Sequence, residues 1–202
     1  MKKMTIYYGS TTGTCETLAA SIAQALGMSN DNVHNVTEMT KEDLENNDVL
    51  ILGSSTWGCG DLQDDWYDGV EILKKADLTG KKVALFACGD GESYGDTFCE
   101  AMTHIHDALA DSGCTFIGKV PTADYTFTSS TAVDGDDFIG LALDDVNESD
   151  KSEARIANRA KQIEAEIVDY RIFHFVCHEF RMTEFIREHL NRTQGRQYQL
   201  QF

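Results

Sequence analysis

A strand, a hydroxyl-rich turn and a helix are expected in immediate succession near the start of the chain. Residues 4–8 form a β-branched and aromatic run that is typical of a buried strand. Leu18, Ile22 and Leu26 follow at four-residue spacing, which indicates a helix. Residues 9–17 join the two elements, so they present free backbone N–H groups and the positive end of the helix dipole. The sequence therefore predicts an anion site at this turn.

The side chains of the turn favour one terminal phosphate, held by neutral donors. Five hydroxyl residues and no Lys or Arg lie between positions 10 and 17. The GxxxxGK[ST] pattern of nucleoside triphosphate loops and the GxGxxG pattern of dinucleotide loops are both absent. The alternative is a Ser/Thr-rich helix cap that binds nothing, because these residues are favoured at helix N-termini.

Length and charge narrow the class of protein. The 202 residues suit one α/β domain with a tail. A net charge of −17 argues against nucleic acid and anionic membranes as partners, and favours a protein partner with a basic surface. The apolar run at residues 4–8 is too short for a signal peptide or a membrane span. Six cysteines without a CxxC pattern suggest buried or half-buried thiols in a reducing cytoplasm.

Apolar runs alternate with helical patterns along the chain. Beyond the first strand, strands are expected at 33–36, 48–53, 82–87, 115–120 and 137–142. Beyond the first helix, helices are expected at 41–46, 65–75, 97–112 and 152–168. This alternation predicts a parallel sheet with helices on both faces.

In such sheets, ligands bind beyond the carboxyl ends of the strands. Residues 54–60 follow the third strand and carry Trp57, and residues 88–95 follow the fourth and carry Tyr94. Each aromatic residue has glycines nearby, and two rings facing across a cleft could enclose a flat ligand. The alternative is that both rings only cap the core. Together with the phosphate turn, they favour a planar ligand with a monophosphate tail.

Three motifs, in order and at matching separations, resemble the flavodoxin family. They are the turn at 9–14, the tryptophan loop at 55–58 with its continuation at 61–66, and the loop at 88–90 with Tyr94, Phe98 and Cys99 behind it. Residues 138–144 resemble the family's last strand, and 121–136 resemble the insertion of long-chain flavodoxins. The resemblance covers about residues 3–168. It implies a three-layer, doubly wound, five-stranded parallel sheet of order 2-1-3-4-5, with an interrupted fifth strand and non-covalent FMN.

The resemblance also implies roles for individual residues. The phosphate would be held by Ser10, Thr11, Thr12 and Thr14, with Ser55 joining from the tryptophan loop, and Gly13 and Cys15 belong to the same turn. Thr56 and Asp90 would lie near the ribityl chain and the ring edge. Trp57 and Tyr94 would cover the two ring faces, and the ring edge would be lined by Cys88, Gly89 and Cys99. The peptide at Gly58 would flip when the flavin is reduced, and the Cys15 thiol would be a weaker donor than the usual hydroxyl.

These roles imply a low-potential one-electron carrier that shuttles electrons between a reductase and acceptor redox enzymes, and that is not itself an enzyme. One alternative is an FMN-dependent quinone or nitro reductase of the same fold, which would need an open ring face. Another is a regulatory domain without FMN, although the acidic pair and phosphoacceptor of a receiver domain are missing from the expected loops.

Residues 169–202 differ from the rest of the chain, since they carry a net charge of +1. We expect a domain over 1–168 and a partly helical extension over 169–202, with an apolar stripe along 171–191 that docks on the domain, a second copy or a partner. A metal site at His174, Cys177 and His178 is a less favoured alternative to packing, and no metal site is expected.

Overall fold

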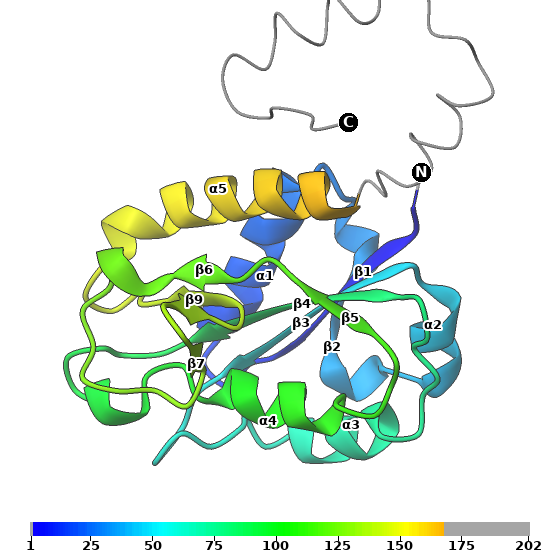
Figure 1. The fold of residues 1–202 in the computed structure, drawn as a ribbon, viewed down its shortest axis with the longest axis horizontal. Coiled ribbons are helices and arrows are strands. Elements are labelled where there is room, and N and C mark those ends of the chain that lie inside the picture. Colours follow the sequence, from blue (N-terminus) through cyan, green and yellow to red (C-terminus); the bar gives the residue numbers. More distant parts are fainter. Residues whose placement is uncertain (1, 168–202) are drawn as a thin grey trace, which may run out of the picture. The chain divides into compact units, whose positions relative to one another are not determined.

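A computed structural model describes residues 2–167 of the chain. The extension expected at 169–202, with its apolar stripe and its histidines, lies outside the described residues. A parallel sheet lies between two layers of helices: α1 (Thr14–Ala25) and α5 (Ser149–Ile167) cover one face, and α3 (Trp66–Leu73) and α4 (Ala101–Ala108) cover the other (Figure 1). A short helix, α2 (Lys41–Asn46), precedes the third strand.

The central sheet has the expected order, β2-β1-β3-β4-β5, and all of its pairings are parallel. Its first four strands in chain order are β1 (Met4–Gly9), β2 (Val33–Asn35), β3 (Val49–Ser55) and β4 (Lys82–Cys88). The fifth position is shared by two short strands. β5 (Thr115–Ile117) pairs with the first half of β4, and β9 (Leu141–Leu143) pairs with the second half. The prediction of an interrupted fifth strand is confirmed.

The interruption is longer than the sequence indicated. It runs from residue 118 to residue 140 and holds a small antiparallel sheet of β6 (Val120–Pro121), β8 (Asp137–Phe138) and β7 (Val133–Asp134). The strands expected at 115–120 and 137–142 are therefore each split in two. Gly118, at φ +71°, ends β5, and Gly140 separates β8 from β9. A side chain at Gly140 would overlap Leu85, so the chain passes β4 closely there.

The helix expected at 97–112 is shorter than predicted. A 3₁₀ turn (Gly95–Thr97) comes first, and α4 begins only at Ala101. Cys99 lies between them at φ +57°, a left-handed conformation that no α-helix continues through. α5, in contrast, begins earlier than predicted, at Ser149 rather than at residue 152.

Each face of the sheet has its own apolar core. β3 shows the division, because Leu50 and Leu52 pack toward α3 and α4, while Val49 and Ile51 pack toward α1 and α5. All four side chains are fully buried, as expected for a central strand covered on both faces. Within residues 2–167, no helix has both the length and the apolar character needed to cross a membrane.

Candidate functional site

A cleft of about 230 Å³ lies where the loops after β1, β3, β4 and β9 meet. Of the residues predicted as ligands, the cleft brings together Thr12, Thr14, Ser55, Thr56, Trp57, Gly58, Cys88, Gly89, Asp90, Tyr94 and Cys99. Ser10, Thr11, Gly13 and Cys15 do not line it, although they belong to the same β1–α1 turn. The structure thus groups most of the predicted residues around one cavity.

The β1–α1 turn leaves the start of α1 uncapped. Gly13 is the residue before the helix, and its φ of +90° favours glycine even though a Cβ there would meet nothing. The Ser10 hydroxyl accepts a hydrogen bond from the Gly13 N–H at 3.1 Å, which closes the turn. No side chain caps α1, so its first N–H groups lack a side-chain partner at the turn that contributes Thr12 and Thr14 to the cleft. This arrangement suits an external anion.

The Cys15 side chain does not belong to the surface of the turn. It is fully buried in the core between α1 and the sheet, and burial raises the pKa of its thiol well above the usual value. The thiol therefore packs in the core of this structure, and its role as a weak donor to a ligand stays a prediction. Cys88 and Cys99 are buried as expected, whereas Cys59 is exposed, against the expectation for the cysteines as a group.

The tryptophan loop is a tight hairpin that presents an aromatic ring. Trp57 and Asp61 pair across it, with N···O distances of 2.9 and 2.7 Å, and Gly58 takes φ +51° at its tip. The Trp57 indole is 42% exposed, and its Nε1 donates to Ser55 Oγ at 2.8 Å. Beside it, the Thr56 hydroxyl is buried without any hydrogen-bond partner. A buried hydroxyl left unpaired in a cleft indicates a missing ligand group.

Hydrogen bonds to the buried Asp144 carboxylate and to Asp90 fix the conformation of the loop after β4. Asp144, which is 2% exposed, accepts from the Gly91 N–H at 2.9 Å. The Asn147 side-chain amide bridges Asp144 and Asp90, at 2.9 Å to each. Hydrogen bonds to Asp90, first among them from the Ser93 N–H, hold the pKa of its carboxyl below the usual range. Tyr94 belongs to this loop, and its side chain is 60% exposed.

The cleft also contains residues that the sequence reasoning missed. They are Thr97, Phe98, Asp145 and Val146. The last two lie in the loop after β9, and Val146 is 69% exposed. The rule that ligands bind beyond the carboxyl ends of strands applies equally to this last strand. Applied there, it would have found Asp145 and Val146.

Comparisons with known proteins identify the family of this chain. The flavodoxin family model matches residues 6–158. Flavodoxin 1 of Salmonella typhimurium is 41% identical over 163 residues, which are 80% of this chain and 93% of that protein. Flavodoxin 2 of Salmonella typhi is 41% identical over 169 residues, 83% of this chain and 98% of that protein.

Solved structures agree as well. The crystal structure of Fusobacterium nucleatum flavodoxin bound to flavin mononucleotide matches with a TM-score of 0.75 at 29% identity, over 82% of this chain and 99% of that one. The K13G mutant of that protein, also bound to flavin mononucleotide, gives a TM-score of 0.76. Sequence motifs, sheet order and loop arrangement therefore lead to the same conclusion: this chain belongs to the flavodoxin family.

Proposed function

We propose that this chain is a low-potential, one-electron carrier that holds FMN non-covalently in the cleft described above. Its electrons come from a reductase and pass to acceptor redox enzymes. The bound FMN supplies the redox chemistry, and the protein supplies binding, orientation and local charge. The free thiols among the described residues support a reducing compartment, the cytoplasm.

The observation that carries the proposal is the unpaired hydroxyl of Thr56. Thr56 lines the same cleft as Thr14 at the start of α1 and the two exposed rings, and the resemblance predicts that it lies near the ribityl chain. A ribityl hydroxyl can both donate to and accept from a threonine hydroxyl, so the ribityl chain of FMN could supply the hydrogen-bond partner that Thr56 lacks. The residues present thus fit FMN: an uncapped helix for the phosphate, Thr56 for the chain, and Trp57 and Tyr94 for the ring.

The same two rings disfavour the reductase alternative. A nicotinamide must approach an open face of the flavin ring to transfer hydride. Trp57 and Tyr94 both line the cleft from separate loops, and a flat ligand held between their rings would have each face covered. An electron carrier does not need an open face.

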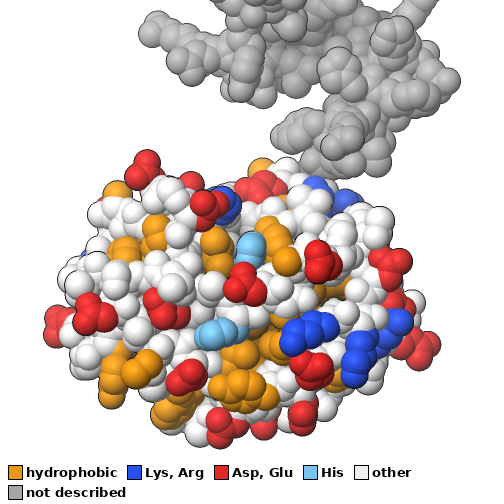
Figure 2. Space-filling view, turned by 60° about the horizontal axis from the view of Figure 1, so that its bottom comes forward, with side chains coloured by type: hydrophobic (Ala, Val, Ile, Leu, Met, Phe, Trp, Pro, Cys, Tyr) orange, Lys and Arg blue, Asp and Glu red, His pale blue; other side chains and the backbone are white. Residues whose placement is uncertain are grey.

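Acidic residues around the cleft set its charge. The loops after β3 and β4 carry several carboxylates, among them Asp61, Asp64, Asp65, Asp90, Glu92 and Asp96. Each solvated carboxylate contributes about 1 kcal/mol at most against added negative charge, but all act in the same direction. This favours a low potential for the second electron. Figure 2 shows acidic side chains scattered over one face of the protein among basic and hydrophobic ones, and the net charge of −17 suits partners with basic surfaces.

Titration of the FMN-free protein with FMN tests the binding site. We expect one FMN per chain, and we expect Trp57→Ala and Tyr94→Ala each to weaken binding by about 1–3 kcal/mol, the range for loss of one aromatic stacking partner. Tyr67→Ala is the control, because Tyr67 is a 56% exposed aromatic residue on α3 that does not line the cleft. Failure to take up FMN, or equal affinity in all four proteins, would contradict the proposal.

Anaerobic photoreduction separates the carrier from the reductase. During reduction, a carrier should develop a transient long-wavelength absorbance band that is absent from both the oxidised and the fully reduced protein. It should consume no NAD(P)H without a partner reductase. Direct bleaching, together with steady NAD(P)H consumption by the chain alone, would favour the reductase instead.

Replacement of Gly58 by valine tests how the tryptophan loop tunes the potentials. The left-handed φ of Gly58 costs a β-branched residue about 1–3 kcal/mol, and a Cβ there would lie 2.9 Å from Asp61 Oδ2. We expect the variant to resist rearrangement of this peptide, and therefore to bring the two one-electron potentials closer together. Gly80→Val is the control, because Gly80 has a φ of +75° and does not line the cleft. Unchanged potentials in Gly58→Val would rule out this role.

A further inference from the structure

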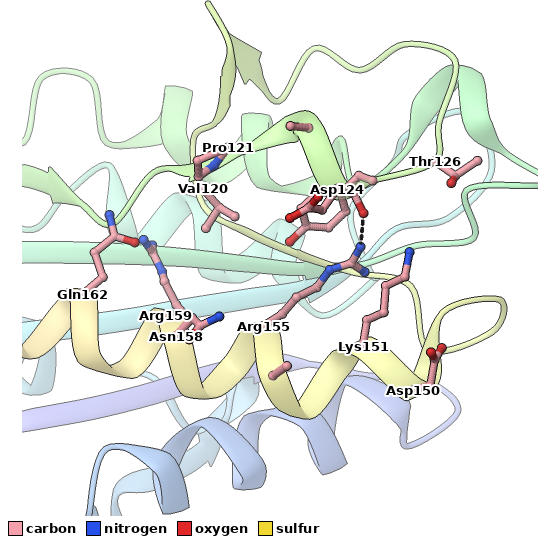
Figure 3. Close-up of a pocket in the computed structure, with 13 residues that line it drawn as sticks. Val120, Pro121, Asp124, Thr126, Asp150, Lys151, Arg155, Asn158, Arg159 and Gln162 are labelled. Carbon is pink, nitrogen blue, oxygen red and sulfur yellow. Dashed lines mark hydrogen bonds between the residues drawn. The ribbon is translucent and has the colours of Figure 1, made fainter.

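A second cleft lies between α5 and the start of the insertion. It has a volume of about 720 Å³ and is lined only by residues 120–126 and 150–162, so it shares no residue with the proposed FMN cleft. Figure 3 shows Arg155, Arg159 and Gln162 rising from α5 toward the segment of Val120 and Asp124. Nothing in the proposed electron-carrier function uses these side chains.

The basic residues of this cleft are unusual for so acidic a chain. Arg155 and Arg159 are the two arginines among residues 1–167, in a chain whose net charge is −17. They lie one helical turn apart on α5, and Lys151 lies one turn before them. All three line the cleft. The sequence thus gathers cations at one place on an otherwise acidic protein.

Several donors of this cleft are buried without a partner. Arg159 is 3% exposed; its Nη2 donates to the Ile117 carbonyl at 3.0 Å, but its Nε and Nη1 have no partner. Arg155 donates through Nη2 to the Asp124 carbonyl and to Glu148, at 2.7 and 2.6 Å, whereas its Nη1 is unpaired. The Tyr125 hydroxyl is also buried and unpaired.

In the part of the chain that the structure describes, most of the buried polar atoms without a hydrogen-bond partner belong to this second cleft. Among the described residues, five buried side-chain polar atoms lack a hydrogen-bond partner, and four of them belong to Tyr125, Arg155 and Arg159. The fifth is the Thr56 hydroxyl in the proposed FMN cleft. Because buried polar groups are nearly always paired in native proteins, a cluster of unpaired donors calls for a ligand.

The guanidinium groups are held in place by the fold. Gly118 has a φ of +71°, and a Cβ there would overlap the Arg159 guanidinium, so the absence of a side chain makes room for it. The Arg155 guanidinium lies over the Tyr125 ring, 3.7 Å from its centroid. The guanidinium groups of Arg155 and Arg159 are therefore preorganised by their contacts with the fold.

The three cations of this cleft have carboxylates nearby, but the ion pairs are unevenly divided among them. Glu148 is shared between Lys151 and Arg155, at 2.6 Å to each, and the Asp124 and Asp150 side chains line the rim. Among the described residues, Arg159 forms no ion pair. Burial lowers the pKa of Arg159 to about 10, so it remains charged at neutral pH. The Glu166 carboxylate raises this pKa in part but forms no ion pair with Arg159, so a bound anion would supply the direct counter-charge.

We propose that this cleft binds a small oxyanion, a phosphate or carboxylate group, between Arg155 and Arg159 of α5 and Tyr125 of the insertion. Guanidinium groups match the paired oxygens of both anions. The unpaired atoms have almost no exposed surface, so an anion reaches them only when the side chains that line the cleft move apart, which favours a small anion or a single such group that loses much of its hydration. Its binding would tie the insertion to α5. This inference does not depend on the proposed electron-carrier function.

Calorimetric titration of the full chain tests the proposal, with FMN already bound so that the phosphate turn of the first cleft is filled. Inorganic phosphate and succinate serve as separate probes, at constant ionic strength balanced with chloride. We expect saturable binding of one equivalent of at least one probe. Displacement of phosphate by succinate would assign the site to both anions, and binding of phosphate alone would restrict it to phosphate.

Three variants make the test specific. Arg159→Gln should weaken binding by about tenfold or more, the effect of losing a charged hydrogen bond. Asn158→Asp adds a negative charge at an exposed position on the rim, so it should weaken binding several-fold without disturbing the core if Arg159→Gln fails to fold. Lys161→Gln removes one charge from an exposed position on the same helix outside the cleft, and it should leave affinity within about twofold.

Two results would overturn the proposal. One is no saturable binding of either anion, in which case ordered water satisfies the donors. The other is an equal loss of affinity in Lys161→Gln and Asn158→Asp, which would mean that the anion responds only to the overall charge of the protein.

Discussion

Replacement of Trp66 by alanine should lower the free energy of unfolding by about 3–5 kcal/mol, the usual range for truncation of a large buried aromatic residue. Trp66 is completely buried, and its Nε1 donates to the Gly53 carbonyl on β3 at 2.8 Å. The indole lies so close to β1 that a Cβ on Gly9 would be 2.8 Å from Nε1. Alanine would therefore leave a cavity beside the ends of β1 and β3, the two strands that lead into the phosphate turn and the tryptophan loop.

The neighbouring residue provides the control for this measurement. Tyr67 lies on the same helix but is 56% exposed, so Tyr67→Ala should change stability by less than about 0.5 kcal/mol. Urea unfolding of the FMN-free proteins compares the variants without a contribution from ligand binding. Similar losses in both variants would mean that Trp66 does not anchor the sheet as described.

The central sheet was predictable because its strands carry a strong local signal. β3 begins with four consecutive apolar residues and β4 has six after Lys82, and such runs are typical of a strand covered on both faces. The spacing of Leu18, Ile22 and Leu26 likewise identified α1, since its apolar stripe must face the sheet. Patterns of this kind depend on the segment itself, and the structure confirms them.

The errors arose where distant contacts decide the local conformation. Cys99 takes a left-handed φ that its residue type disfavours, and the helix expected over 97–112 begins late as a result. In the insertion, Phe138 pairs with both Val120 and Val133 rather than extending into β9. The residue type of Cys99 gives no signal for its conformation, and Gly118 and Gly140 mark a break in the chain but do not indicate the antiparallel pairing of Phe138.

Most residues of the first cleft could be predicted from the sequence, whereas those of the second cleft could not. Trp57 and Tyr94 were found because each stands in a glycine-rich loop after a strand, a position that the fold class makes meaningful. The unpaired donors of Arg155 and Arg159 were not predictable. They became visible only when the backbone placed Gly118 and Tyr125 against α5.

A second large effect is expected at Asp144, whose carboxylate joins two loops of the FMN cleft. It is 2% exposed and accepts from the backbone N–H groups of Gly91, Val146 and Asn147 at 2.9, 3.1 and 2.9 Å. Asp144→Ala would leave these donors without their partner, at a cost of about 1–3 kcal/mol for each one that stays buried. We expect a total loss of stability of about 3 kcal/mol or more.

The same change should weaken FMN binding, although Asp144 does not line the cleft. The Asn147 amide links Asp144 to Asp90, so loss of Asp144 would release the loop that carries Tyr94. We expect an affinity about tenfold lower or more, because the loop must then be ordered on binding. Asp144→Asn keeps one acceptor oxygen and should recover part of both losses, while Asp111→Ala, at an exposed position, should match the unmodified protein. Urea unfolding and FMN titration of all four proteins check this, and full FMN affinity in a destabilised Asp144→Ala would show that Asp144 supports the fold but does not position the site.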